Sequence, residues 1–175
     1  FEVLRHLDNP YVAKVVDSGI EEVEVSGVSY PILWIATDLV KGTTLGAEIS
    51  EHGVLERGQW LELAHDILHG ISAAHEANIV HLDIKPANIM RFSRRSVIID
   101  FGGASYVDVA DEGDIGVYTF GFAAPEQVDG RTAPEDYQFE VDLFSIGAVL
   151  AFAGTGVLPW DLPSGRNLSP NLSAL

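Results

Sequence analysis

The chain has 175 residues, of which 47% are hydrophobic, and its formal net charge is -16 at pH 7. This length and composition fit a single domain with a packed core and exclude a disordered chain. The charge argues against nucleic acid or an anionic membrane as the main partner, because both need a cationic surface, and the lack of cysteine excludes disulfides and thiolate metal sites.

The first forty residues predict the end of a helix and then two strands. The apolar residues on one side of this helix are Val3, Leu4 and Leu7. A turn around Pro10 ends it. We expect strands at about 11–20 and 31–40, and the acidic segment EEVEVSG between them should extend the hairpin that they form.

Two later segments predict helices, with short strands between them. Apolar residues recur every three to four positions from 56 to 77, which is typical of an amphipathic helix. Short strands are expected at 79–81, 89–91 and 97–100. The sequence VDLFSIGAVLAFA, residues 141–153, is apolar on nearly every side and predicts a central, buried helix. No run reaches the ~20 apolar residues of a membrane helix, so we expect no membrane segment in this chain. For the compartment, we expect the cytoplasm.

The stretch HLDIKPANIM, residues 81–90, places four polar side chains among apolar ones. They are His81, Asp83, Lys85 and Asn88. A second carboxylate, Asp100, ends the predicted strand SVIID and is followed by Phe101 and Gly102. Further along the chain come Ala124-Pro125-Glu126 and, from Asp142 to Gly147, DLFSIG.

These four motifs, in this order, resemble those of the eukaryotic-type (Hanks-type) serine/threonine protein kinases, which carry HxDxKxxN, DFG, APE and DxxSxG. The resemblance implies ATP and Mg²⁺ or Mn²⁺ as cofactors and a protein as the substrate. Lys85 and Thr119, in VYTFGFAAPE, resemble the serine/threonine branch of the family rather than the tyrosine branch.

The chemistry of phosphoryl transfer suits the residue types of the opening motif. The reaction needs charge to be neutralised and two oxygens to be held in line. The Asn88 amide oxygen and the Asp100 carboxylate are the ligands that a hard divalent cation prefers. Lys85 can offset charge on the moving phosphoryl group, and Asp83 can orient the substrate hydroxyl and accept its proton.

The resemblance also implies a nucleotide site. Thr37 would be the gatekeeper residue, and Met90 would form the apolar floor beneath the adenine. The backbone carbonyl of Asp38 and the backbone N–H of Val40 would hydrogen-bond the adenine.

Other residues would have structural roles in such a domain. Leu4, Val15, His81 and Phe101 would stack as the regulatory spine of the family. Gly102, Thr119 and Glu126 would complete their motifs. A carboxylate at the start of an apolar helix must find donors; in the family, the residue that matches Asp142 bonds backbone N–H groups of the catalytic loop.

The resemblance implies an α+β, protein-kinase-like fold. Residues 1–40 would be the C-terminal part of the β-rich N-lobe, with the end of helix C, strands 4 and 5 and the hinge. Residues 41–175 would be the helical C-lobe, truncated after the central helix. The glycine-rich loop and the strand lysine of the family should then precede Phe1, so we expect a fragment that is inactive by itself.

Three alternatives compete with this interpretation. Small-molecule kinases, such as aminoglycoside and choline kinases, share HxDxxxxN, but they usually lack the equivalents of Lys85 and the Ala124–Glu126 motif. A pseudoenzyme that binds nucleotide or acts as a scaffold would have no chemical need for Asp83, Lys85, Asn88 and Asp100 together. The histidines of HDILH, residues 65–69, have a metal-binding spacing, but without a third ligand they are favoured as surface residues.

The segment after Asp100 departs from the pattern of the family. Leu82 stands where many kinases carry an Arg that receives an activation-segment phosphate. Residues 101–126 contain no Lys or Arg, and a phosphate there would meet like charge. The acidic residues of this segment include Asp108, Asp111, Glu112 and Asp114. We therefore expect that activity does not require its phosphorylation.

Overall fold

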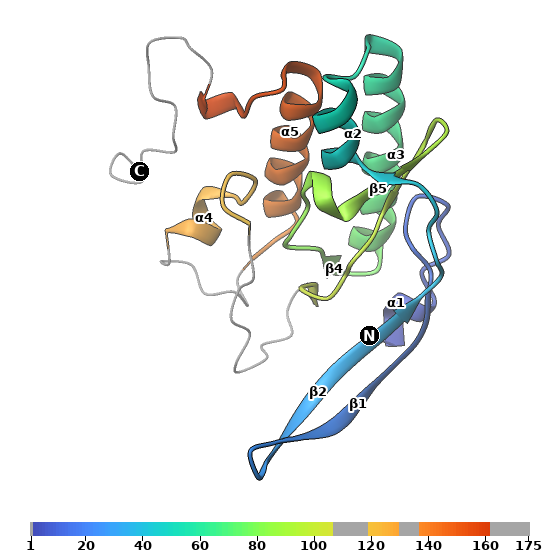
Figure 1. Ribbon diagram of the computed structural model, residues 1–175, viewed down its shortest axis with the longest axis vertical. Helices are drawn as coiled ribbons and strands as arrows, with labels where there is room; N and C mark the ends of the chain where they lie inside the picture. The colour runs from blue at the N-terminus through green and yellow to red at the C-terminus, as the bar shows by residue number, and fades with distance from the viewer. Residues whose placement is uncertain (1, 107–118, 130–136, 162–175) are drawn as a thin grey trace.

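The computed structural model describes residues 2–106, 119–129 and 137–161. Figure 1 shows a long two-stranded hairpin that projects from a body built mainly of helices. The hairpin consists of β1 (Val15–Val25) and β2 (Val28–Thr37), and the short helix α1 (Glu2–Arg5) lies beside it. The strands come first and most of the helices follow, which confirms the predicted α+β organisation.

The acidic segment extends the hairpin, as predicted, and the turn at its end is tight. The strands pair antiparallel up to Val25 opposite Val28. Ser26 and Gly27 make the connection, and both have positive φ, at 54° and 80°, as a two-residue hairpin turn requires. The strands therefore run directly into the turn, and the acidic segment belongs mostly to β1. The strand predicted at 11–20 begins and ends later in the structure, as Val15–Val25, and the strand predicted at 31–40 begins and ends earlier, as Val28–Thr37.

The helix α2 (Leu45–His52) was not predicted. Its N-cap residue is Thr44, whose side-chain oxygen accepts a hydrogen bond from the Ala47 N–H over 3.2 Å. Leu45 and Ile49, one helical turn apart, are its buried residues. Two turns with one buried pair give too short a pattern to be recognised by periodicity.

The predicted helix at 56–77 is confirmed as α3 (Arg57–Glu76). Its buried apolar residues are Leu63, Ile67, Ile71 and Ala74. The helix α5 (Glu140–Thr155) packs against it, and the Trp60 indole N–H donates to the Leu150 carbonyl over 2.7 Å. The predicted buried helix is confirmed, because Val141, Ile146, Val149 and Ala153 are all buried, although Leu143 is 50% exposed.

Short strands join the helical body to the chain segments that carry the motifs. One sheet has the order β3-β5-β6, with β3 (Thr43–Thr44), β5 (Ile89–Phe92) and β6 (Arg95–Ile98). A second pairs β4 (Ile79–Val80) with β7 (Ser105–Tyr106). The strand predicted at 97–100 ends at Ile98, because Asp100 has a φ of 63°, which extended backbone does not allow.

Three further short elements complete the described chain. They are the 3₁₀ helix η1 (Pro86–Asn88), the helix α4 (Pro125–Val128) and the 3₁₀ helix η3 (Pro159–Asp161). In the parts of the chain that the structure describes, no helix is both long enough and apolar enough to cross a membrane.

Candidate active site

A buried carboxylate holds the backbone of the loop that carries the first motif, residues 81–88. Asp142, in the first turn of α5, is 0% exposed. Its Oδ2 accepts a hydrogen bond from the His81 N–H over 2.8 Å, and its Oδ1 accepts one from the Leu82 N–H over 2.9 Å. His75, near the end of α3, places Nε2 2.8 Å from the same Oδ2. The hydrogen bonds predicted for Asp142 are thus present, and they hold Leu82 at a φ of 67°.

Asp83, Lys85 and Thr119 form a closed ring of polar contacts. The Lys85 ammonium lies 2.6 Å from Asp83 Oδ2 and donates to Thr119 Oγ1 over 2.8 Å. The Thr119 hydroxyl donates to Asp83 Oδ1 over 2.7 Å. Hydrogen bonds to an ionised group are shorter and stronger than neutral ones, so this ring orients the Asp83 carboxylate.

Asn88 links this ring to the chain segment before the second motif, Asp100-Phe101-Gly102. Its side-chain amide donates to the Asp83 carbonyl over 2.9 Å and to Asp83 Oδ2 over 3.2 Å. Its own backbone carbonyl accepts from the Ile99 N–H over 2.9 Å. The residue after Ile99 is Asp100, so this bond holds the loop next to the second carboxylate.

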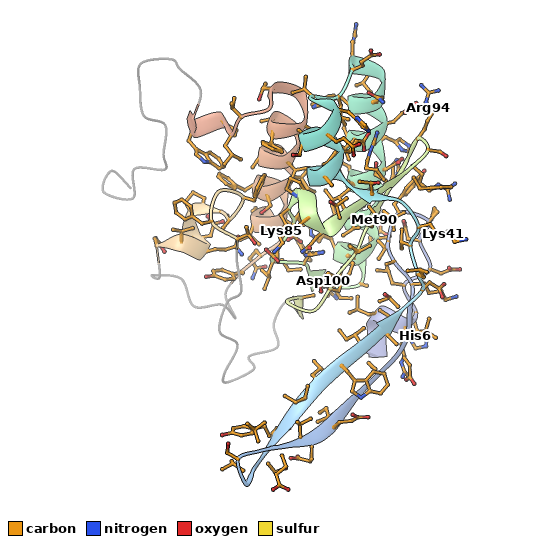
Figure 2. All side chains as sticks on the ribbon, viewed as in Figure 1. His6, Lys41, Lys85, Met90, Arg94 and Asp100 are labelled. Carbon is orange, nitrogen blue, oxygen red and sulfur yellow. The ribbon has the colours of Figure 1, made fainter. Side chains whose placement is uncertain are left out.

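A cavity of about 380 Å³ lies beside the second motif. Five of the six residues predicted to bind nucleotide or metal line it: Thr37, Asp38, Val40, Met90 and Asp100. The sixth, Asn88, is not among the lining residues. Figure 2 shows Lys85, Met90 and Asp100 in the same region, between the helical body and the hairpin.

Among the residues that the structure describes, none forms a backbone hydrogen bond with the Asp38 carbonyl or the Val40 N–H, the two groups predicted to meet the adenine. The Asp38 N–H is taken by the Lys14 carbonyl over 2.9 Å. The groups predicted to meet the adenine are different ones, namely the Asp38 carbonyl and the Val40 N–H. Both belong to residues that line the cavity.

Asn88 and Asp100 offer oxygen atoms that suit a hard cation. The Asn88 amide group uses its nitrogen to donate to Asp83, which leaves its oxygen. Asp100 accepts from the Gly102 N–H at Oδ1 over 3.2 Å, which leaves Oδ2. A Cβ on Gly102 would lie 3.0 Å from Asp100 Oδ1, so a glycine allows this close turn. Within the described ranges, neither remaining oxygen receives a hydrogen bond, and the donor set fits Mg²⁺ or Mn²⁺.

The four residues predicted to stack in the core are all buried. Leu4, Val15 and Phe101 belong to one hydrophobic cluster. The ring of His81, which is 0% exposed, lies 4.6 Å from the ring of Phe101, measured between centroids. Because His81 is fully buried, its ring packs in the core and does not contact solvent.

Two residues that hold the loop were missed from the sequence. Gln127 is buried, accepts from the Ala124 N–H and donates to the Leu82 carbonyl, both over 2.9 Å. A Gln three residues into a helix that starts at a proline is a known capping signal, and it was available in the sequence. The contact of His75 with Asp142 had no local signal.

For other residues singled out in the sequence, the described part of the chain shows no contact that bears on the predicted role. Glu126 lies in the first turn of α4, and no residue that the structure describes makes an ion pair with it. The acidic residues of the segment after Asp100, namely Asp108, Asp111, Glu112 and Asp114, lie outside the described residues. The rings of His65 and His69 lie 4.4 Å apart, but within the described chain no group of three or more His, Cys, Asp or Glu side chains is placed to hold a metal.

Comparison with known proteins agrees with this geometry. The model of the family described as "Protein kinase domain" matches residues 1–172. A probable serine/threonine-protein kinase, PkwA, from Thermomonospora curvata is 35% identical over 130 residues, which are 73% of this chain and 17% of that protein. A probable serine/threonine-protein kinase, pknA2, from Bifidobacterium longum is 31% identical over 156 residues, 87% of this chain and 19% of that protein.

A third relative is the serine/threonine-protein kinase pkn3 from Myxococcus xanthus, 31% identical over 170 residues, 90% of this chain and 29% of that protein. The chain spans about a fifth of the length of the first curated relatives that it matches. The motifs predicted from the sequence, the linked polar ring and these matches lead to one conclusion: the chain belongs to the protein kinase domain family, on its serine/threonine branch.

Proposed function

We propose that this domain takes part in ATP-dependent phosphoryl transfer to Ser or Thr hydroxyls of a protein substrate. The observation that carries the proposal is the ring of Asp83, Lys85 and Thr119, which Asn88 extends toward the carboxylate of Asp100. A scaffold has no need for a carboxylate held in this way.

The cavity residues would bind the nucleotide. The Asp38 carbonyl and the Val40 N–H would hydrogen-bond the adenine, between Thr37 and Met90. Asn88 and Asp100 would hold Mg²⁺ or Mn²⁺, which neutralises charge on the phosphate oxygens when bound. Among these residues, Met90 supplies an apolar surface and the others supply polar atoms, as a small-molecule site requires.

Asp83 would act on the substrate hydroxyl. Its carboxylate would orient the hydroxyl and accept its proton while the new O–P bond forms and the bond between the γ-phosphorus and the bridging oxygen of ATP breaks, so that ADP leaves. Lys85 would place its ammonium where it offsets charge on the transferred group. Thr119, which bonds both side chains, would hold them in their positions.

The two parts of the molecule would correspond to the two lobes of the family. Residues 1–40 would form the C-terminal part of the N-lobe, and residues 41–175 the C-lobe. Because the proposed reaction consumes ATP, we place it in the cytoplasm.

The test is transfer of labelled γ-phosphate from ATP by the full-length protein with Mg²⁺, compared with an Asp83→Asn variant. Loss of the carboxylate should lower the rate by about 10²-fold or more. Glu51→Gln, an exposed position on α2, is the control for a change of one charge and should leave the rate unchanged. Equal transfer by wild type and Asp83→Asn would contradict the proposal. Binding of ATP with no transfer by the wild type would favour the pseudoenzyme.

A further inference from the structure

A second cavity, of about 490 Å³, lies on the side of the molecule where the β5–β6 turn meets α3. Its lining residues are Tyr11, Asp66, Phe92, Ser93, Arg94 and Arg95. It shares none of these with the cavity beside Asp100. Figure 2 places Arg94 next to α3, far from Asp100 and Lys85. We call this second cavity the arginine notch.

One wall of the arginine notch is held rigidly by the backbone. The Tyr11 N–H donates to Asn9 Oδ1 over 2.9 Å, and the Tyr11 carbonyl accepts from the Ile98 N–H over 2.8 Å. Gly70 of α3 comes so close that an added Cβ would lie 2.9 Å from the Tyr11 carbonyl oxygen. A residue fixed on both sides in this way offers a preformed wall, which reduces the entropic cost of binding.

The ring of Tyr11 is supported by the two histidines of HDILH. The His65 ring meets it edge-on at 5.6 Å, and the His69 ring lies at 6.1 Å, between centroids. Within the described ranges, no residue bonds the Tyr11 hydroxyl, which is therefore available to a ligand.

The carboxylate in the notch is already satisfied. Asp66 is 6% exposed, and its Oδ2 accepts from the Ser96 N–H over 2.7 Å. Its Oδ1 lies 3.0 Å from His65 Nδ1. Because both oxygens have partners inside the protein, Asp66 does not compete for a ligand as a free anion would.

The notch therefore presents cationic groups. The side chain of Arg94 is 78% exposed, and its Nε lies 3.1 Å from Glu62 Oε1. Arg95 makes no side-chain hydrogen bond or ion pair with any residue that the structure describes. Phe92, paired with Arg95 across the two strands, is 60% exposed. Two adjacent guanidinium groups beside a phenol and a phenyl ring are unusual on a chain with a net charge of -16.

We propose that the arginine notch binds a phosphorylated side chain of a protein segment. A phosphate carries a charge of about -1.5 to -2 in a small volume and accepts several hydrogen bonds, so one group can meet both guanidinium groups and the Tyr11 hydroxyl. Arginine matches the geometry of phosphate oxygens with paired N–H groups.

The net negative charge of the chain disfavours binding of the other kind of anionic peptide, one rich in Asp and Glu. An extended run of Asp and Glu would place its outer carboxylates against an acidic surface, at distances of about 8 Å where screening is incomplete. A single dianion inside the notch gains the attraction of Arg95 and of Arg94, which it would share with Glu62, and keeps away from the wider acidic surface. Phe92 would cover the apolar part of the segment that carries the phosphate.

The test measures binding of a fluorescent peptide with one phosphoserine and no other charged side chain to the full-length protein. Arg95→Gln should weaken binding about tenfold, as expected for one charge-assisted contact. Tyr11→Phe removes only the hydroxyl and should weaken it by a smaller factor. Arg57→Gln, an exposed arginine at the start of α3, removes the same charge elsewhere and should leave binding unchanged.

Any of four results would overturn the proposal. One is the absence of saturable binding by the wild type. Another is the same affinity in Arg95→Gln, Tyr11→Phe and Arg57→Gln. The third is equal binding of a peptide with glutamate in place of phosphoserine, which would make the site one for carboxylates. An Asp100→Asn variant should bind the phosphopeptide normally, whereas its loss of binding would place the peptide in the active site as a product. This assay needs no phosphoryl transfer, so it can fail or succeed independently of the proposed function.

Discussion

The catalytic loop and the β1–β2 hairpin use polar and apolar side chains in opposite ways. At the loop, Asp142 is 0% exposed, and its oxygens meet two backbone N–H groups and His75. On the hairpin, Ile20 is 70% exposed and Tyr30 48%. The body of the molecule therefore buries charge with full hydrogen bonding, while the hairpin leaves large apolar side chains in contact with solvent.

The difference shows where the site gets its geometry. Of all β1 residues, only Val15, at the base of the hairpin, is buried. Ile35 and Thr37, at the end of β2, line the cavity beside Asp100. Only the base of the hairpin thus contributes to the site, and changes further out should have small effects, whereas changes in the loop should be severe.

The largest effect is expected for Asp142→Ala. It leaves two buried backbone N–H groups without an acceptor, and we expect a loss of about 3–5 kcal/mol in the free energy of unfolding, together with loss of activity. Urea unfolding and a kinase assay on the full-length protein measure both. Glu21→Ala, an exposed carboxylate of the hairpin, is the control and should change neither. An unchanged urea midpoint and unchanged activity in Asp142→Ala would contradict the anchoring role of this residue.

Two glycines with positive φ allow a matched comparison of the two regions. At Gly42, with a φ of 131°, an added Cβ would lie 2.1 Å from the Arg91 carbonyl oxygen. At Gly27, with a φ of 80°, it would meet nothing within 4 Å. Gly42→Ala should therefore cost about 2–3 kcal/mol, and Gly27→Ala about 1 kcal/mol from backbone strain alone. Equal urea midpoints for the two variants would show that packing around Gly42 adjusts freely.

Replacement of Gln127 tests a smaller part of the loop support. Gln127→Ala removes one donor to the Leu82 carbonyl and one acceptor for the Ala124 N–H. We expect a loss of about 1–2 kcal/mol and a lower rate of phosphoryl transfer. The exposed Gln138, close to the start of α5, serves as the control, because Gln138→Ala deletes the same type of side chain at a position in contact with solvent. A stability for Gln127→Ala that matches this control would mean that water replaces the lost contacts.

The smallest effect is expected on the outer hairpin. Tyr30 lies opposite Val23, which is 40% exposed. Tyr30→Ser should lower stability by about 0.5 kcal/mol or less, because little buried area is lost. A decrease above about 1.5 kcal/mol in the full-length protein would show that this face is covered there, which would narrow the difference between the two regions.

The candidate site was largely predictable because its residues lie close together in the sequence. Asp83, Lys85 and Asn88 occur within one short motif, and their residue types suit phosphate and metal chemistry whatever surrounds them. The periodic spacing of apolar residues predicted α3, because helical packing repeats locally. In contrast, α2 has only one buried pair, and its capping residue, Thr44, is of a type common in loops.

By itself, the sequence determined which side chains are available for the chemistry, their order and the position of the main helices. Only the tertiary structure decided that Thr119 closes the ring around Asp83, and that His75 and Gln127 support the loop. It also decided that Tyr11, Arg94 and Arg95 line one notch. These contacts join segments far apart in the chain. They depend on how helices and strands pack against one another, which the local spacing of residues does not predict.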